Sequence, residues 1–260
     1  MGFLTISRLE YSYHTMNGET KALSDINIEV EKGEFLAIVG PSGCGKSTLL
    51  HLIAGLLPSE GGSIEIEGKP VSESRRSIGY MLQRDHLLEW RTTYENILLG
   101  LEINHMINEK SKARIDELLA AYGLSAFKDV LPRELSGGMR QRAALIRTLV
   151  MEPELLLLDE PFSALDYQTR LKVADDICGI LRKEGKTAVL ITHDISEAVS
   201  IADRVIVLTK RPGKIKKELE ICLTLPDGRK PETPFEARSA VEFGRYYNKI
   251  WKELMDDESR

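Results

Sequence analysis

The stretch Gly40-Pro41-Ser42-Gly43-Cys44-Gly45-Lys46-Ser47 decides the fold of this chain. It fits the pattern G-x-x-x-x-G-K-[ST], in which glycines let the backbone curl so that successive N–H groups point inward at an anion. Lys46 is predicted to place its ammonium on the β- and γ-phosphates of a nucleotide, and Ser47 to offer its hydroxyl to Mg²⁺. Thr48, the next residue, is counted with the loop as nucleotide-binding.

The segments beside the loop fit this interpretation. Phe35–Val39 is a continuous apolar run, as a strand buried in a parallel sheet requires, and the pattern over 48–56 is helical. The positive end of that helix would face the phosphates. A glycine-rich turn that contains Lys-Ser by chance is the alternative, and the flanking strand and helix disfavour it. A dinucleotide site is also disfavoured, because Thr48 stands where the third glycine of that motif belongs.

The composition narrows the class of protein. The 260 residues include 35 Lys and Arg and 40 Asp and Glu, so the formal net charge is −5. This mild acidity argues against a nucleic-acid binder that works by bulk charge, and the length fits one large α/β domain or two modest ones. No apolar run approaches the roughly 18 residues needed to span a bilayer. Cys44, Cys178 and Cys222 lie far apart without metal-ligand spacing, which predicts free thiols.

Strand patterns alternate with helical patterns along the rest of the chain. Apolar runs at Leu155–Leu158, Thr187–Ile191 and Arg204–Leu208 are separated by helical segments. This alternation predicts a parallel sheet that is covered on both faces. Residues 3–66 are predicted to form short strands broken by turns, and 91–149 to form a helical lobe.

Two strand ends carry candidate catalytic residues. Asp159 and Glu160 follow an apolar strand, and ligands of an α/β sheet bind beyond the carboxyl ends of its strands. Asp159 is predicted to hold Mg²⁺, and Glu160 to orient a water that attacks the γ-phosphate, or to take its proton. A solvated acidic turn is the alternative, which the Lys46 loop disfavours. His193 follows another apolar strand at the same edge and is predicted to contact the γ-phosphate or hold that water.

A third motif separates the remaining classes of nucleotide-binding protein. Leu135-Ser136-Gly137-Gly138-Met139-Arg140-Gln141-Arg142 lies between the Lys46 loop and the acidic pair, and it resembles the signature of ATP-binding-cassette (ABC) ATPases. Ser136, Gly137 and Gly138 open a helix, so they form a second anion-binding helix terminus. One chain cannot easily aim this terminus and Lys46 at the same nucleotide. The resemblance implies that two subunits pair head to tail and hold each ATP between them.

The resemblance covers about residues 3–220 and implies further roles. It implies that Tyr13 stacks on adenine, for which a core tyrosine is the alternative. It also implies that Gln83 reaches Mg²⁺ and the attacking water. The segment Ser163-Ala164-Leu165-Asp166 matches the family's loop that crosses the dimer interface, and Met139 stands where the signature commonly has Gln.

Two segments resemble the importer ATPases of the nitrate, sulfonate and taurine group. These are Leu87–Arg91 and Arg211–Ile215, although Glu89 stands where that group usually has Pro. Importers of other small solutes, such as pyrimidine precursors, share these features, so the solute stays open. The 84–91 segment mixes apolar and charged side chains and is the predicted docking surface for a membrane channel. An ordinary loop with core residues is the alternative.

The predicted fold class is α/β: a P-loop NTPase core with a mixed sheet flanked by helices, an antiparallel β subdomain and a helical signature subdomain. The ATPase domain is predicted to span 1–220, with the helical subdomain at about 84–150. Residues 221–260 form a C-terminal extension with an apolar stripe at helical spacing. The stripe comprises Phe243, Tyr246, Tyr247, Ile250, Trp251 and Leu254. It predicts an amphipathic helix packed on its own domain, with a partner-binding helix as the alternative.

The resemblance therefore implies the ATP-hydrolysing subunit of an ABC importer, with ATP and Mg²⁺ as cofactors. The implied partners are a second copy of the chain, integral membrane permease subunits and, through the assembled transporter, a solute-binding protein. No nucleic-acid partner is expected. The implied location is the cytoplasmic face of the cell membrane, as a peripheral subunit.

Other classes of nucleotide-binding protein fit this sequence less well. A soluble cassette ATPase acting on chromosomes needs a long coiled coil before the signature, for which 91–134 has no room. The ribosome-acting type usually carries two cassettes in one chain. A P-loop kinase or GTPase is disfavoured by Leu135–Met139. A cassette without catalysis is disfavoured because the loop lysine, the acidic pair and His193 are all present.

Overall fold

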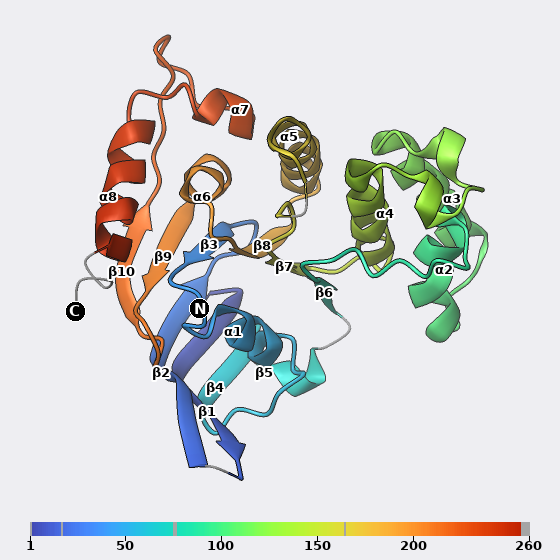
Figure 1. Ribbon diagram of the computed structural model, residues 1–260. Helices are drawn as coiled ribbons and strands as arrows, with labels where there is room; N and C mark the ends of the chain where they lie inside the picture. The colour runs from blue at the N-terminus through green and yellow to red at the C-terminus, as the bar shows by residue number, and fades with distance from the viewer. Residues whose placement is uncertain (1, 17, 75–76, 164, 256–260) are drawn as a thin grey trace.

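The apolar run Phe35–Val39 forms strand β3, which lies inside a mixed sheet. The computed structural model describes residues 2–16, 18–74, 77–163 and 165–255. The other strands of this sheet are β6 (Ile78–Met81), β7 (Leu155–Asp159), β8 (Thr187–Ile191), β9 (Arg204–Leu208) and β10 (Ile215–Glu220). The order is β10-β9-β3-β8-β7-β6 (Figure 1). Neighbouring strands run parallel except β10, which is antiparallel to β9.

Both faces of this sheet are buried. Phe35, Ala37 and Val39 belong to one hydrophobic cluster, while Leu36 and Ile38 belong to another. Because successive residues of a strand point to opposite faces, both faces must be apolar. This is why the buried strands are continuous apolar runs in the sequence rather than alternating patterns.

One face of the mixed sheet is covered by helix α1 (Lys46–Ile53) and a second, antiparallel sheet. The second sheet contains β1 (Leu4–Thr15), β2 (Gly18–Val30), β4 (Gly61–Ile66) and β5 (Lys69–Pro70), in the order β2-β1-β4-β5. A 3₁₀ turn at Val71–Glu73 follows β5. Leu49 and Ile53 of α1 share a core cluster with inner residues of both sheets.

The N-terminal strands differ from the predicted short strands. β1 and β2 contain 12 and 13 residues. Their pairing shifts register around Leu9, and Arg8 and Asp25 have positive φ values of 47° and 52°. An extra residue in one strand bends a paired ladder without ending it. The irregularities that suggested turns are therefore places where long strands bend.

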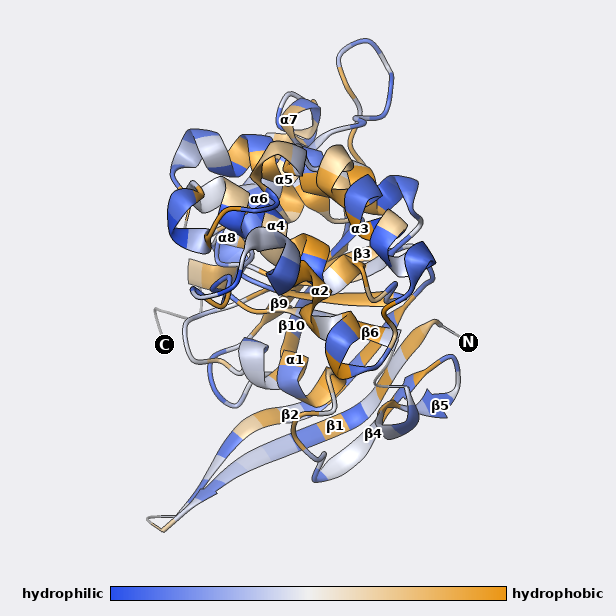
Figure 2. Cartoon of the chain, turned by 90° about the vertical axis from the view of Figure 1, so that its right-hand side faces the viewer, coloured by the Kyte–Doolittle hydropathy of each residue, from blue (hydrophilic) through white to orange (hydrophobic). Residues whose placement is uncertain are grey.

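The opposite face of the mixed sheet carries helices, and a helical lobe extends from one end of it (Figure 1). Helices α5 (Tyr167–Lys183) and α6 (Ile195–Ile201) cover this face. The lobe contains α2 (Thr93–Ile103), α3 (Glu109–Ala121) and α4 (Gly137–Leu149), with 3₁₀ turns at Ser125–Phe127 and Pro132–Glu134. Figure 2 shows apolar residues concentrated in the strands and inner helix faces, with polar residues on the outer turns. The predicted fold class is confirmed.

Side-chain caps set where the helices of the lobe begin. The Thr92 hydroxyl accepts from the backbone N–H of Glu95, and the Glu95 carboxylate accepts from the Thr92 N–H. Asn108 and Ser111 form the same reciprocal pair at the start of α3. Ser136 caps α4 by accepting from the Met139 N–H at 3.3 Å. Each cap satisfies backbone donors that a helix start leaves free.

The C-terminal extension packs against the helices on the face covered by α5 and α6. It contains α7 (Pro234–Ala237) and α8 (Phe243–Met255). Tyr246 and Ile250 of α8 are buried in the larger core cluster, whereas Trp251 is 47% exposed and stacks on Tyr247. The Phe235 N–H donates to Asp175 of α5 at 2.8 Å. Among the described helices, none combines the length and the apolar character that a membrane crossing requires.

Candidate functional site

The glycine-rich loop curls around the Lys46 side chain. Gly43 and Gly45 have positive φ values of 72° and 109°, a backbone conformation that favours glycine. Nζ of Lys46 donates to the carbonyl oxygens of Gly40 at 2.8 Å and Pro41 at 2.9 Å. The ammonium is thus largely buried and held inside the curve of the loop.

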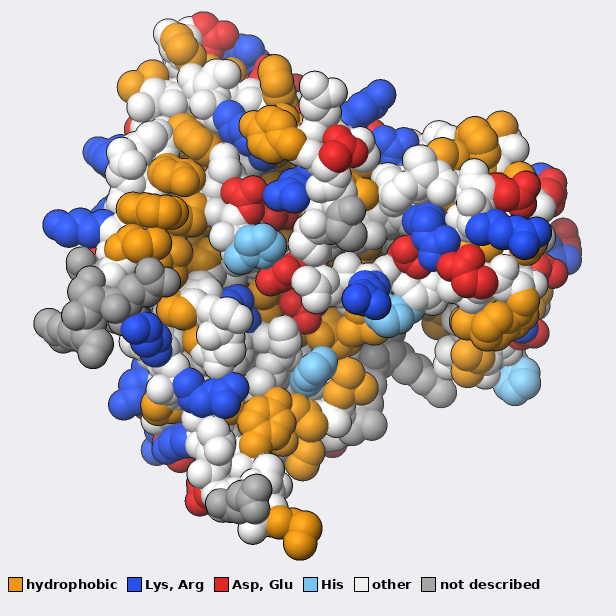
Figure 3. Space-filling view, in the orientation of Figure 1, with side chains coloured by type: hydrophobic (Ala, Val, Ile, Leu, Met, Phe, Trp, Pro, Cys, Tyr) orange, Lys and Arg blue, Asp and Glu red, His pale blue; other side chains and the backbone are white. Residues whose placement is uncertain are grey.

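A pocket of about 410 Å³ opens over this loop. Its lining consists of loop and α1 residues together with Glu160, His193 and Arg211. The predicted phosphate-binding residues that line it are Gly40, Ser42, Gly43, Gly45, Lys46, Ser47 and Thr48. Figure 3 shows histidine and acidic side chains close together near the centre of this face, between the sheet core and the helical lobe. The structure therefore brings the loop and two of the predicted catalytic side chains to one pocket.

Ser47 and Asp159 meet at the predicted Mg²⁺ site. The Ser47 hydroxyl donates to Oδ1 of Asp159 at 3.4 Å. Burial raises the pKa of Asp159 above its usual value, with Glu160 acting in the same direction. The neighbouring Tyr80 hydroxyl is buried without a hydrogen-bond partner among the described residues.

These groups fit a hard cation. A hydroxyl and a carboxylate are the oxygen ligands that Mg²⁺ prefers, and Mg²⁺ usually keeps waters and phosphate oxygens as its other ligands. The structure holds no cluster of three or more His, Cys, Asp or Glu suited to a metal within the described ranges. A site with only one or two protein ligands, completed by phosphates and water, agrees with that finding.

Glu160 is the point at which the predicted catalytic residues converge. Nε2 of Gln83 donates to Oε2 of Glu160 at 2.9 Å, and Nδ1 of His193 lies 3.2 Å from the same oxygen. Glu160 has a positive φ of 45°, an uncommon conformation for a residue with a side chain. Its carbonyl accepts from the Ser163 hydroxyl at 3.0 Å, and its N–H donates to Ile191 at 2.8 Å. The backbone contacts hold the conformation that aims this carboxylate into the pocket.

The loop that carries His193 is tied to the start of α6. The Thr192 hydroxyl donates to Oε2 of the buried Glu197 at 2.5 Å and accepts from the Asp194 N–H at 3.0 Å. Burial raises the pKa of Glu197 to about 7. Asp194, the N-cap of α6, acts in the same direction, while the hydrogen bond from Thr192 and the charges of Arg170 on α5 and Arg238 after α7 act against it.

Glu197 gives a testable pH dependence of stability. Its pKa is higher in the folded chain than in the unfolded chain, so folding favours the protonated form. The contribution of this group to the free energy of unfolding is fully present at low pH. It falls by roughly 3 kcal/mol as the pH rises from about 4.5 to 7. The Glu197→Gln variant is expected to lack this loss. The difference between its free energy of unfolding and that of the wild type should therefore shift in favour of the variant between pH 5 and pH 8. Urea unfolding at both pH values checks this, and parallel pH curves would contradict it.

Tyr13 lies beside the first turn of α1. Its hydroxyl is 2.9 Å from Oγ1 of Thr48, and its ring meets that of Tyr11 edge to face at 5.1 Å. The side chain is 36% exposed. A half-open ring next to the glycine-rich loop is compatible with the predicted stacking on adenine.

The signature residues lie apart from the pocket. Ser136 and Gly137 are exposed at the start of α4, and Gly138 packs so closely that an added Cβ would lie 2.9 Å from Thr169. None of Ser136, Gly137 and Gly138 lines the pocket over the glycine-rich loop. Within the described part of one chain, the two predicted anion-binding helix starts do not share a pocket.

The 84–91 segment is bound to the signature helix through Arg140. Nε and Nη2 of Arg140 donate to the two carboxylate oxygens of Asp85 at 2.9 and 3.0 Å, and Nη2 also donates to Glu89 at 2.7 Å. Burial acts to raise the pKa of Asp85, but hydrogen bonds from Arg140 and the Leu87 N–H outweigh it and lower that pKa. Trp90 of this segment is 75% exposed. The segment is thus fixed on its inner side, and Trp90 stands on its outer side beside the exposed polar residues Arg84, His86 and Glu89.

Arg211 is a pocket residue that the sequence did not identify as one. It lines the pocket over the glycine-rich loop, and its Nε donates to the Gly43 carbonyl at 3.1 Å. The next turn is locked beneath the loop, since a Cβ on Gly213 would lie 2.3 Å from the Cys44 carbonyl oxygen. In the sequence, Arg211 belongs to the subfamily motif Arg211–Ile215, which gives no sign of this contact with the loop. The interface-loop prediction includes Ala164, which lies outside the described residues.

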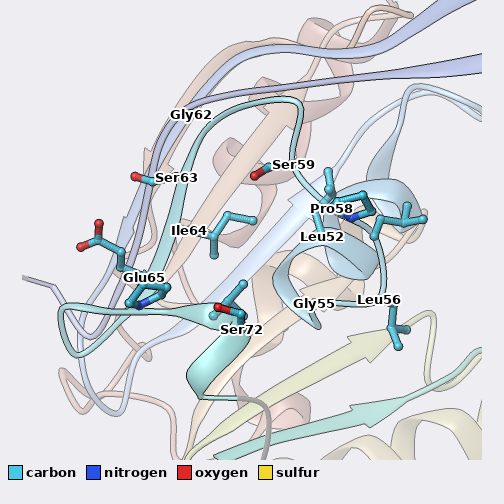
Figure 4. Close-up of a pocket in the computed structure, with 13 residues that line it drawn as sticks. Leu52, Gly55, Leu56, Pro58, Ser59, Gly62, Ser63, Ile64, Glu65 and Ser72 are labelled. Carbon is cyan, nitrogen blue, oxygen red and sulfur yellow. The ribbon is translucent and has the colours of Figure 1, made fainter.

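A second pocket, of about 490 Å³, lies where the end of α1 and the loop after it meet β4 and β5 (Figure 4). Leu52, Ile64 and Val71 give it apolar walls, and Ser59 and Ser72 also line it. It is larger than the pocket over the glycine-rich loop, but it contains none of the predicted site residues. Size alone therefore does not locate the chemistry of this protein.

Comparison with known proteins gives a consistent result. The family described as ABC transporter matches residues 23–163. The chain is 45% identical over 254 residues to the "Uncharacterized ABC transporter ATP-binding protein YtlC" of Bacillus subtilis, covering 98% of this chain and 96% of that protein. It is 42% identical to the "Aliphatic sulfonates import ATP-binding protein SsuB" of the same species, covering 87% of this chain and 88% of that protein.

A solved structure extends the likeness to three dimensions. The ATP-binding cassette MJ0796, solved as a dimer in a post-hydrolysis state with ADP and phosphate, matches with a TM-score of 0.73 and 31% identity. That match covers 84% of this chain and 99% of the other. The resemblance stated from the sequence is thereby confirmed. The chain belongs to the ABC transporter family and is an ATP-binding cassette ATPase.

Proposed function

We propose that this chain is the ATPase subunit of an ABC importer, in which two copies close on ATP and drive uptake of a small solute through a separate membrane permease. The observation that carries the proposal is the convergence of Gln83 and His193 on one oxygen of Glu160, beside the glycine-rich loop. This arrangement is suited to holding and deprotonating a water next to a γ-phosphate.

The hydrolytic step follows from these positions. Lys46 holds the β- and γ-phosphates, and Mg²⁺ bound by Ser47 and Asp159, with Gln83 as a further ligand, would neutralise their charge. Glu160 orients a water whose oxygen attacks the γ-phosphorus, and it accepts the proton that the water releases. The bond from the γ-phosphorus to the bridging oxygen breaks, which gives ADP and phosphate. His193 keeps the Glu160 carboxylate in place.

Closure of two copies explains why the signature residues lie outside the pocket. Ser136 and the two glycines after it form an exposed helix start that can bind phosphate, but they do not line the pocket of their own chain. A second chain turned head to tail would supply this helix start from across the nucleotide. The charged phosphates then favour closure, because each surface alone supplies only part of the groups that can bind them. Loss of the γ-phosphate removes that link and lets the pair open.

The 84–91 segment is the proposed docking surface for the permease at the cytoplasmic face of the membrane. Exposed Trp90 offers apolar contact area, as does Leu82 just before the segment, and Asp85 and Glu89 transmit displacement to α4 through Arg140. α4 begins at Ser136, so a shift of the segment moves the signature. Solute delivery would come from a separate solute-binding protein.

The solute class rests on the importer relatives. Three proteins named as aliphatic sulfonate import ATP-binding proteins are 42%, 41% and 36% identical to this chain over most of its length. This supports a solute of the nitrate, sulfonate and taurine class. The chain itself binds ATP rather than solute, so its own pocket does not select among these solutes.

An uptake assay tests the proposal. A strain that lacks this chain is complemented with the wild type, Glu160→Gln, Trp90→Ala or Trp251→Ala, and uptake of labelled methanesulfonate, taurine and nitrate is measured. The wild type and Trp251→Ala are expected to restore uptake of at least one of these solutes. Glu160→Gln should abolish it, and Trp90→Ala should reduce it several-fold, as expected for an aromatic contact residue. Uptake that does not depend on the chain for any of the three would contradict the assignment.

A further inference from the structure

We propose that Arg170 is a positioning residue for His193, because its guanidinium joins the 163–166 interface loop to the loop that carries His193. The inference rests on the proposed function, in which 163–166 meets a second copy and His193 holds Glu160. It assigns a role to a side chain on α5 that lies outside the pocket.

The first support is that one side chain contacts both loops. Nη2 of Arg170 donates to the Leu165 carbonyl at 3.1 Å, and Nη1 lies 3.4 Å from Oδ2 of Asp194. The Arg170 and Asp194 side chains are 23% and 28% exposed, so this pair is partly shielded from solvent. A planar guanidinium can satisfy two acceptors at fixed angles, which a lysine ammonium does not match.

The second support is the way in which the His193 loop is held. Asp194 uses its other oxygen, Oδ1, to cap α6 by accepting from the Glu197 N–H at 3.2 Å. On the other side of His193, the Thr192 hydroxyl is fixed by Glu197. The two neighbours of His193 are therefore both anchored, and Asp194 is the one that reaches across to α5 through Arg170.

These contacts form a closed ring around the catalytic carboxylate. The Ser163 hydroxyl binds the Glu160 carbonyl, Leu165 binds Arg170, and Arg170 binds Asp194. The ring closes where His193 meets Oε2 of Glu160 at 3.2 Å. A displacement of the interface loop pulls on Arg170 and, through Asp194, shifts His193 relative to Glu160. Closure of two copies would in this way align the hydrolytic side chains.

The position of Arg170 on its helix argues against a merely local role. It lies in the first turn of α5, which begins at Tyr167, and the partial positive charge of a helix N-terminus opposes a cation there. Its Nε is also buried with no hydrogen-bond partner in the described ranges. Neither the helix N-terminus nor the unpaired Nε favours an arginine at this position. Its contacts with Leu165 and Asp194 therefore explain it better than the stability of α5 does.

The test uses ATP turnover by the purified full chain. Arg170→Met keeps an unbranched stem like that of arginine but lacks the guanidinium and so removes both contacts, and Asp194→Asn keeps the α6 cap but removes the charged partner. Each is expected to lower kcat by roughly 10-fold or more while KM for ATP changes less than about 2-fold, because a misplaced catalytic group slows chemistry rather than binding. The double variant should be no slower than the slower single variant.

Arg182 is the matched control on the same helix. It makes the same type of contacts, to Asp203 at 3.1 Å and to the Ile201 carbonyl at 2.7 Å, near the other end of α5. Arg182→Met should keep the wild-type kcat, and thermal midpoints of all variants confirm folding. Unchanged kcat in Arg170→Met, an effect on KM alone, or multiplying losses in the double variant would overturn the inference. Those results would leave the proposed function intact, whereas full turnover by Glu160→Gln would count against the proposed function itself.

Discussion

Replacing Glu160 by glutamine is expected to lower ATP turnover by about 10²- to 10⁴-fold, which is the usual contribution of a general base. The amide keeps the size of the carboxylate but cannot take a proton from water. Gln83 and His193 both converge on Oε2 of Glu160, so the substitution changes the group at the centre of the site while leaving the glycine-rich loop intact. ATP binding should therefore persist.

The same variant should accumulate as an ATP-bound dimer, because the γ-phosphate link is not removed. Phosphate release measures turnover, and size-exclusion chromatography with and without ATP measures the dimer. Glu154→Gln is the matched control, since Glu154 directly precedes the opposite end of β7 and is about half exposed. It should hydrolyse ATP at the wild-type rate. Wild-type hydrolysis by Glu160→Gln would remove Glu160 from the mechanism.

Replacing Lys46 by alanine is expected to raise the Kd for ATP by roughly 10- to 100-fold, because a hydrogen bond to a charged partner is worth about 1.5–3 kcal/mol. Lys46 is largely buried and its Nζ is held by the Gly40 and Pro41 carbonyls, so its side chain is already ordered inside the curve of the loop. An ordered side chain loses little conformational entropy on binding, which keeps its contribution large.

Isothermal titration calorimetry with ATP in the presence of Mg²⁺ measures this change. Lys32→Ala is a matched control, because Lys32 is 65% exposed and pairs with Glu67 away from the pocket. Its Kd should equal that of the wild type. An unchanged affinity in Lys46→Ala would show that the loop does not bind phosphate through this residue.

The bounds of the buried strands could be predicted accurately from the sequence. The predicted ranges Thr187–Ile191 and Arg204–Leu208 are the observed bounds of β8 and β9. Strands with two covered faces leave continuous apolar runs, which few other elements produce. β10 was not predicted, because Ile215–Glu220 is an edge strand whose pattern Ile-Lys-Lys-Glu-Leu-Glu carries little apolar signal. β1 and β2 were predicted as short strands rather than long ones, since bulges interrupt their alternation.

The part of the candidate site that lies at the carboxyl ends of strands could be predicted from the sequence. Asp159, Glu160 and His193 follow buried parallel strands, so a common edge could be inferred before the structure. Gln83 could be named only through family resemblance, because an uncharged amide leaves no local pattern. Arg170 and Arg211 could not be placed at all. Their roles depend on where long side chains reach across the fold, and sequence spacing does not encode that reach.

The two tryptophans of the chain lie on different surfaces, which has a practical consequence. Trp90 is on the 84–91 segment and is 75% exposed, while Trp251 stacks on Tyr247 in the C-terminal extension. The intrinsic fluorescence of the protein therefore contains one signal from each surface. Trp251→Phe leaves an emission that reports contact at the 84–91 segment, and Trp90→Phe leaves one that reports the packing of α8. The chain thus carries its own optical probes for partner contact and for the packing of its C-terminal extension.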